Sequence, residues 1–128
     1  MRRLTPGPLY FEFSGHNDIR LRIESGETIV VEAEDAFSGQ IRTDDDRRDK
    51  VAAPFGNPQT GPIWIEGAQP GDALAVEILD IQPTIGQCAT RTGAAQQLSE
   101  WLGDDCPHGT HVCPIRDGQV HWSDEITI

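Results

Sequence analysis

The stretch of sequence that decides the fold runs from residue 57 to residue 78 and reads Asn57-Pro58-Gln59-Thr60-Gly61-Pro62-Ile63-Trp64-Ile65-Glu66-Gly67-Ala68-Gln69-Pro70-Gly71-Asp72-Ala73-Leu74-Ala75-Val76-Glu77-Ile78. Its first two prolines each fix their own φ and push the preceding residue towards extended geometry. The pattern predicts a rigid loop, a strand over residues 63–66, a turn over 69–72 and a nearly all-apolar strand over 74–81. Such a loop suits the wall of a binding site, although these physical features alone favour a plain connector between strands.

Working outward, the residues before this stretch also read as strands. Residues 9–13 are rich in aromatic side chains, and residues 19–23 alternate between apolar and basic side chains. A period of two is typical of a half-buried strand. With a turn at residues 25–27 and an apolar run over 28–33, the sequence predicts a β-hairpin from 19 to 33.

The residues after this stretch continue the pattern. Asp117-Gly118 between two strand-like runs, 110–115 and 119–122, predicts a second hairpin. Residues 94–102 have helical spacing of Leu98, Trp101 and Leu102, and predict one short helix. The last strand, 125–128, is apolar and is expected to need a partner. We therefore predict an all-β chain, a sandwich or distorted barrel, with residues 1–128 forming a single domain.

The composition of the chain argues against several classes of function. The 128 residues carry a formal net charge of −11, which argues against binding nucleic acid or an anionic membrane surface. No apolar run approaches the roughly 20 residues needed to cross a bilayer, and the first residues do not read as a signal peptide. Three cysteines, an odd number, fit a reducing compartment, so we expect a cytoplasmic protein.

Two motifs in register resemble one known family. Asn-Pro-x-Thr-Gly-Pro, Glu-Gly-Ala and Pro-Gly-Asp within residues 57–72 are similar to the signature of the acetamidase/formamidase family. Upstream, the run Ser25 to Ile41 resembles the same family's Asp-Ala turn and Gly-Gln-Ile. The resemblance runs from about Ile19 to Ile81 and continues weakly to Ile128, which is about the first half of the family's usual length.

The resemblance implies a jelly-roll-like β-sandwich that hydrolyses a linear carboxamide to a carboxylate and ammonia, with a divalent metal such as zinc in several members. The family's second half normally brings a His-Gly-Gly-Asn-type loop and a Gly-Asp-x-His segment, and neither occurs in this sequence. We therefore expect a second polypeptide, from a split gene or from cleavage of a precursor, to complete the fold in an oligomer, with truncation of a longer chain as the trivial alternative. The alternative is a non-catalytic scaffold or small-molecule-binding module that has lost the amidase site.

The resemblance makes Asp35 the leading site residue. Asp35 follows a predicted strand and precedes the small residues Ala36, Ser38 and Gly39, which allow close approach of a ligand. Its carboxylate could bind a zinc-like ion or act as general base towards the attacking water. The alternative is an aspartate that turns the chain by bonding its own backbone.

Other candidates are weighed against ordinary structural roles. Gln40 is a catalytic candidate that would orient the substrate amide, and a solvated strand residue is an equal alternative. Asn57 and Thr60 are candidate substrate-binding residues, with turn stabilisation as the alternative and the favoured one for Asn57. Glu66 is a further substrate-binding candidate, with an ion pair to an arginine as the favoured alternative.

Two positions depart from the family pattern. The family's histidine near the first strand aligns with Phe11, so His16 in the following loop is the nearest candidate metal ligand, against the favoured alternative of a surface histidine. Where the family tends to have a Pro-Gly-Phe-Gly-like loop, this chain has Thr-Arg-Thr-Gly-Ala-Ala over 90–95. Arg91 there suggests a larger or anionic substrate.

One further cluster contains metal-binding atoms. Cys106, His108, His111 and Cys113 lie within eight residues, but their spacing matches no familiar zinc motif. Variable hairpin residues with no metal are the favoured interpretation. The mixed charges over 43–50 predict a solvated loop or a short helical turn.

Overall fold

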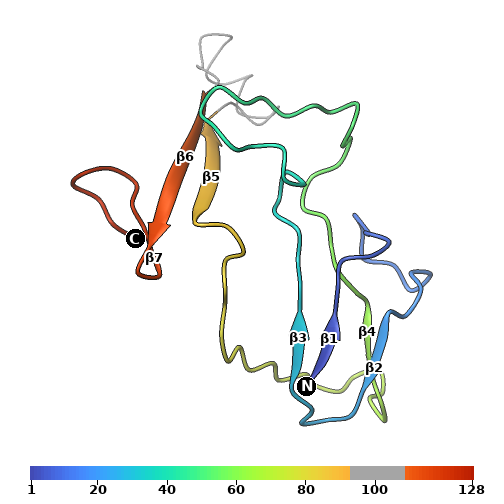
Figure 1. Cartoon of the computed structure of the whole chain (residues 1–128). Coiled ribbons are helices and arrows are strands. Elements are labelled where there is room, and N and C mark those ends of the chain that lie inside the picture. Colours follow the sequence, from blue (N-terminus) through green and yellow to red (C-terminus); the bar gives the residue numbers. More distant parts are fainter. Residues whose placement is uncertain (93–108) are drawn as a thin grey trace. The chain divides into compact units, whose positions relative to one another are not determined.

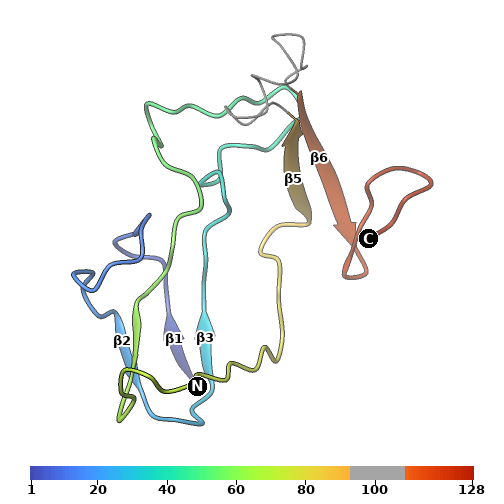
Figure 2. The same ribbon diagram turned by 180° about the vertical axis from the view of Figure 1, so that it is seen from behind.

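The computed structural model describes residues 1–92 and 109–128 and divides into two compact units (Figures 1 and 2). The first unit contains residues 1–39 and 49–77, and the second contains residues 40–48 and 78–128. No helix among the residues that the structure describes is both long and apolar enough to cross a membrane.

The first unit is built from four short strands in two parallel pairs. Strand β1 (Arg2–Leu4) pairs with β3 (Ile29–Val31), and β2 (Leu21–Ile23) pairs with β4 (Ile63–Ile65), as Figure 1 shows. Arg2 of β1 binds the Glu27 carboxylate at 3.1 Å, and the Arg3 side chain binds that of Glu32. These ion pairs join β1 to the residues on either side of β3, and they accompany a parallel register that the apolar pattern alone does not specify.

The predicted hairpin from 19 to 33 is wrong in its pairing. The strands β2 and β3 lie where the alternation predicts them, but they do not pair with each other. The turn between them is set by side chains, since the Glu27 carboxylate accepts the Glu24 N–H at 3.1 Å. Each strand instead finds a parallel partner distant in sequence, and local periodicity carries no information about such partners.

The second unit is one antiparallel sheet, β5 (Gln87–Thr92), β6 (Gly109–Arg116) and β7 (Gln119–Val120), in that order. The predicted Asp-Gly hairpin is confirmed: Asp117 and Gly118 both have positive φ, 52° and 76°, as a type I′ turn requires. The last residues fold back on β7, because Val120 and Ile128 exchange backbone hydrogen bonds of 2.9 Å. The predicted strand over 125–128 is absent as a strand: this stretch contains an isolated antiparallel bridge between His121 and Thr127.

The charged block over 43–50 is anchored to β6. The Asp44 carboxylate accepts the Val112 N–H at 2.6 Å, and the Thr110 hydroxyl donates to the Asp46 carbonyl at 3.0 Å. A backbone N–H of β6 that does not pair with β5 is thus satisfied by a side chain. The predicted solvated loop is mainly exposed, as expected, but it also covers part of a strand edge.

Very little of the described chain is core. Among the residues described, the buried hydrophobic side chains are Leu4 in the first unit and Ile41 and Cys113 in the second. Burying one large aliphatic side chain contributes about 1.5–3 kcal/mol, so this core offers little stability. Many large hydrophobic side chains are instead exposed.

Residues 74–81 were predicted to form a strand, and they form none. The segment leads from the turn after β4 towards β5 in Figure 1, and residues 73–83 have no regular secondary structure. Five of its large apolar side chains are exposed, to between 64% and 75%: Leu74, Val76, Ile78, Leu79 and Ile81. A strand needs a hydrogen-bonded neighbour, and the described chain supplies none here.

The predicted strand over residues 9–13 is also absent. Its one strand-like contact is an isolated bridge between Tyr10 and Gln59. The predicted helix over 94–102 lies outside the described residues. Within the described residues the fold is made of strands in small parallel and antiparallel sheets, without a helix and without a closed barrel or sandwich.

Candidate functional site

Asp35 closes a tight turn just after β3. One carboxylate oxygen accepts the Phe37 N–H at 2.7 Å, and the other accepts the Gly39 N–H at 3.0 Å. The Asp35 carbonyl accepts the Ser38 N–H at 3.0 Å, and Ser38 and Gly39 both have positive φ. The backbone-bonding role considered for this residue is therefore confirmed. Asp35 is exposed, so its carboxylate is also accessible to a ligand.

The loop of the Asn-Pro motif lies against this turn. The Asn57 N–H donates to the Ala36 carbonyl at 3.0 Å, so two motifs that are separated in sequence meet in the first unit. Asn57 itself has φ 56°, a conformation that asparagine tolerates better than most residues. Gln59 then exchanges backbone hydrogen bonds of 2.8 and 3.2 Å with Tyr10. The rigid loop predicted from the prolines is anchored at both ends of this stretch.

Thr60 carries an unusual polar atom. Its Oγ1 is inaccessible to solvent and has no hydrogen-bond partner in the part of the chain that the structure describes. The next residues are fixed, since the Pro62 carbonyl accepts the Arg20 N–H at 2.9 Å and the Gly61–Pro62 peptide is cis. A buried hydroxyl without a partner costs free energy, so a polar group that hydrogen-bonds Thr60 Oγ1 would stabilise the loop.

Glu66 is held at the end of β4. Its carboxylate lies 3.3 Å from Arg22 Nη1, and it accepts the Trp64 Nε1–H at 3.2 Å. The Arg22 guanidinium also lies over the Trp64 ring, 5.1 Å from its centroid. The ion pair that was the favoured alternative for Glu66 is confirmed. A shallow hollow lined by Ile63, Trp64, Ile65 and Ala68 lies beside it.

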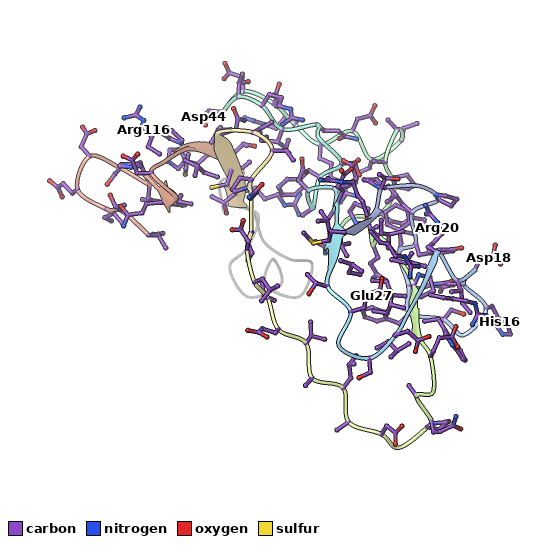
Figure 3. The ribbon with its side chains drawn as sticks, turned by 60° about the horizontal axis from the view of Figure 1, so that its bottom comes forward. His16, Asp18, Arg20, Glu27, Asp44 and Arg116 are labelled. Atoms are coloured by element: carbon purple, nitrogen blue, oxygen red, sulfur yellow. The ribbon has the colours of Figure 1, made fainter. Side chains whose placement is uncertain are left out.

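The other predicted site residues are His16, Gln40 and Arg91. His16 lies in an exposed loop and points outward in Figure 3, as the surface alternative predicts. Gln40 and Arg91 belong to the second unit, where Arg91 is exposed and opposite Thr110 in the β5–β6 register. The first unit thus brings together Asp35 and Asn57, with Thr60 in the same loop.

The histidine–cysteine cluster is only partly described, because Cys106 and His108 lie outside the described residues. His111 Nε2 lies 3.0 Å from the Trp122 carbonyl oxygen, and the two rings meet edge to face at 5.0 Å. Its Nδ1 lies 3.8 Å from Asp44, a neighbour that sequence reasoning missed because the two residues are far apart in the chain. Cys113 is buried on the same strand, opposite Cys88.

The described residues do not form a complete zinc site. No group of three or more His, Cys, Asp or Glu side chains converges in residues 1–92 and 109–128. The Asp35 oxygens already accept two backbone N–H groups, although each carboxylate oxygen has capacity for a second contact. This stretch of chain could therefore supply one ligand but not the closed or three-residue set that zinc takes in proteins.

Comparison with known proteins identifies relatives of the chain. The model of the Acetamidase/Formamidase family matches residues 13–119. The chain is 43% identical over 67 residues to a protein of Schizosaccharomyces pombe named as a formamidase, and 42% identical over 64 residues to an acetamidase of Mycolicibacterium smegmatis. It also superposes on the crystal structure of an acetamidase from Bacillus halodurans with a TM-score of 0.82 and 29% identity.

These matches cover part of each relative. The aligned regions span 51% and 48% of this chain, and 16% of each of the two curated relatives. The structural match covers 98% of this chain and 42% of the Bacillus halodurans acetamidase. The chain therefore corresponds to about two fifths of a complete relative.

Proposed function

Because this chain belongs to the acetamidase/formamidase family, we propose that it supplies one part of an enzyme that hydrolyses a linear carboxamide to a carboxylate and ammonia. The observation that carries the proposal is the match of nearly the whole chain to an acetamidase, at a TM-score of 0.82. The residues of the two family motifs meet through the hydrogen bond between Asn57 and Ala36. Functional residues brought together in this way support a shared site.

In this proposal the Asp35 turn and the 57–62 loop form one wall of the active site. Asp35 holds the attacking water, either as a general base or through a bound metal ion. Oxygen adds to the amide carbon, the C–N bond breaks, and the nitrogen leaves as ammonia after taking up a proton. In the same proposal, the hydroxyl of Thr60, which is buried and without a described partner, hydrogen-bonds the substrate or a group of the completing polypeptide.

The remaining wall comes, in the proposal, from a second polypeptide. Relatives with a solved structure are longer, since this chain covers 42% of the Bacillus halodurans acetamidase. The described residues lack a convergent set of metal ligands and bury few hydrophobic side chains. Both features support a site and a core that other residues complete. Any zinc would then be held by Asp35 together with ligands from the second polypeptide.

The test uses the assembly that contains this chain, purified through a tag on the chain. Ammonia release from formamide, acetamide and longer linear amides is measured with and without a chelator, and the chain alone serves as control. We expect release from the assembly and none from the chain alone. Loss of release with chelator, and its recovery on adding zinc, would support the metal.

Two outcomes separate the alternatives. Ammonia release that persists in the presence of chelator would support hydrolysis and contradict a role for a metal ion. An assembly that binds amides without releasing ammonia would overturn the enzyme and support a binding module that has lost the amidase site.

A further inference from the structure

We propose that residues 74–81 are the docking strand of this chain, which pairs with a strand of the polypeptide that carries the rest of the family fold. The inference rests on the proposed function, because it names where the completing polypeptide binds. It assigns an interaction surface to a segment that contributes nothing to the candidate site, since none of the candidate site residues lies within it.

The first support is the exposure of the segment. Leu74, Val76 and Ile78 are 67%, 75% and 71% exposed, and Leu79 and Ile81 are 64% and 75% exposed. Scattered exposed hydrophobic residues are ordinary, but five within eight consecutive residues are a local concentration of exposed apolar side chains, which is typical of an interaction site.

The second support is the backbone. In the part of the chain that the structure describes, no backbone hydrogen bond involves residues 74–81, and the Gln82 side chain donates a hydrogen bond of 2.6 Å to the Asp80 carboxylate. Backbone N–H and C=O groups in an extended segment are free to form a ladder with an added strand. The segment thus offers both main-chain groups and apolar side chains.

The third support is the pattern of side chains. Leu74, Val76 and Ile78 fall on one face of an extended chain, and Leu79 and Ile81 on the other. Apolar residues on both faces are typical of a strand that is covered on both sides. A flat surface of another protein would cover one face, whereas insertion into the remainder of a fold covers both.

The occupant follows from the length of the family fold. The chain matches 42% of the Bacillus halodurans acetamidase over 98% of its own length. More than half of that protein is therefore available to cover surfaces that this chain leaves open. A polypeptide with the sequence of that remaining part is the occupant that fits, rather than a second copy of this chain.

The experiment compares two aspartate substitutions. Val76→Asp changes the centre of the docking strand, and Val51→Asp changes a valine that is 93% exposed elsewhere in the first unit. The probe is the polypeptide that co-purifies with the chain and whose sequence matches the uncovered part of the acetamidase fold, produced separately. Binding is measured by calorimetry, and amide hydrogen exchange is followed over residues 74–81.

We expect Val76→Asp to weaken binding by about tenfold or more, because a charge in an apolar interface is left without a partner. Val51→Asp should change binding by less than about twofold, as surface substitutions usually do. Amides in 74–81 should exchange quickly in the free chain and slowly in the complex. Both variants should keep the circular dichroism spectrum of the free chain, because both side chains are already exposed.

The failures are distinguishable. If the complex releases ammonia but both variants bind equally and 74–81 exchanges quickly in it, the docking strand is wrong and the proposed function stands. If the variants differ as expected but the complex releases no ammonia, the docking strand stands and the function fails. Slow exchange of 74–81 in the free chain, with a dimer in light scattering, would assign the segment to a second copy and overturn the proposal.

Discussion

Cys88 on β5 and Cys113 on β6 are directly opposed cross-strand partners, and the Cys113 side chain is 1% exposed. Burial raises the pKa of the Cys113 thiol, and the neighbouring Cys88 thiol raises it further. Both cysteines are free thiols in the structure. At this pair of facing residues, a buried thiol on β6 therefore lies opposite a more accessible thiol on β5.

This difference predicts unequal labelling. Cys113 should react with iodoacetamide more slowly than Cys88, because the thiolate is the reactive form and Cys113 is buried and has a raised pKa. Peptide mass spectrometry separates the two sites and also separates Cys106. In urea the two rates should become similar. Equal rates in the folded chain would contradict the burial of Cys113.

The second prediction separates the two roles of Asp35. Asp35→Ala removes the acceptor of the Phe37 and Gly39 N–H groups and should lower the free energy of unfolding by about 1–2 kcal/mol. Asp35→Asn keeps one carbonyl oxygen and should recover part of that loss. If Asp35 is a catalytic base or ligand, Asp35→Asn should still reduce ammonia release by the assembly by about 100-fold or more. Parallel recovery of stability and activity in Asp35→Asn would assign the residue to the turn alone.

Removing the Thr60 hydroxyl is predicted to leave the chain as stable or more stable, but to weaken amide binding by the assembly. Thr60→Val removes a buried hydroxyl that has no described partner, so the chain by itself should be unchanged or stabilised by about 1 kcal/mol. In the assembly the same variant should raise KM for the amide, while Thr60→Ser, which keeps the hydroxyl, should not. Clear destabilisation of the chain by Thr60→Val would mean that the hydroxyl has a partner.

The Asp44–Asp46 block predicts a pH dependence. Hydrogen bonds from the backbone N–H groups of Arg42 and Thr43 hold the pKa of the Asp46 carboxyl below its ordinary value. A folded-state pKa below the unfolded one contributes stability above the unfolded pKa, and this contribution is lost as the pH falls through the folded pKa. Asp46→Asn should therefore flatten the loss of stability on acidification below about pH 4.

Urea unfolding at pH 6 and pH 3 measures this effect. Asp45→Asn is the matched control, because it removes the same charge from the next residue, for which no carboxylate hydrogen bond is described. Equal flattening by the two substitutions would assign the effect to net charge rather than to the Asp46 hydrogen bonds.

The last prediction concerns Arg91. Its guanidinium is exposed at the end of β5, and an anionic substrate would bind it through a charge-assisted hydrogen bond. Arg91→Ala should raise KM for amides that carry a carboxylate by about tenfold and leave KM for acetamide unchanged. Arg116→Ala, which removes an exposed arginine from the end of β6, is the control. An unchanged KM for all amides would remove Arg91 from substrate binding.

The sequence predicted elements where the signal is local. The strands at 21–23, 29–31 and 63–65 follow apolar runs, and the Asp117-Gly118 turn follows from the positive φ that those two residues tolerate. The all-strand character of the described residues was predicted for the same reason.

Pairing was not predictable, because it depends on residues far apart in the chain. Arg2–Leu4 has two arginines and one apolar residue and shows no strand signal, yet it pairs with β3 through ion pairs to Glu27 and Glu32 and the burial of Leu4. Gln87–Thr92 was missed because its polar residues give no apolar alternation. Conversely, residues 74–81 carry a strong strand signal but have no partner in the described residues.

The sequence predicted which residues belong to the candidate site better than it predicted how those residues are arranged. The Asp35 turn and the Asn57 loop were both singled out from the sequence, and the turn-forming alternative for Asp35 proved correct. Their meeting through Ala36 was not foreseen. Neither was the unpartnered hydroxyl of Thr60, because satisfaction of a buried polar atom depends on three-dimensional surroundings.

The parallel pairing of β2 with β4 has a consequence for synthesis of the chain. Leu21–Ile23 leaves the ribosome well before Ile63–Ile65, so the edge of β2 stays open while the intervening residues are translated. Pairings between distant residues form slowly, because closing the loop between them costs chain entropy before the stabilising contacts can form. Nascent chains should thus pass through a stage with an unsatisfied strand edge, during which chaperone binding competes with aggregation.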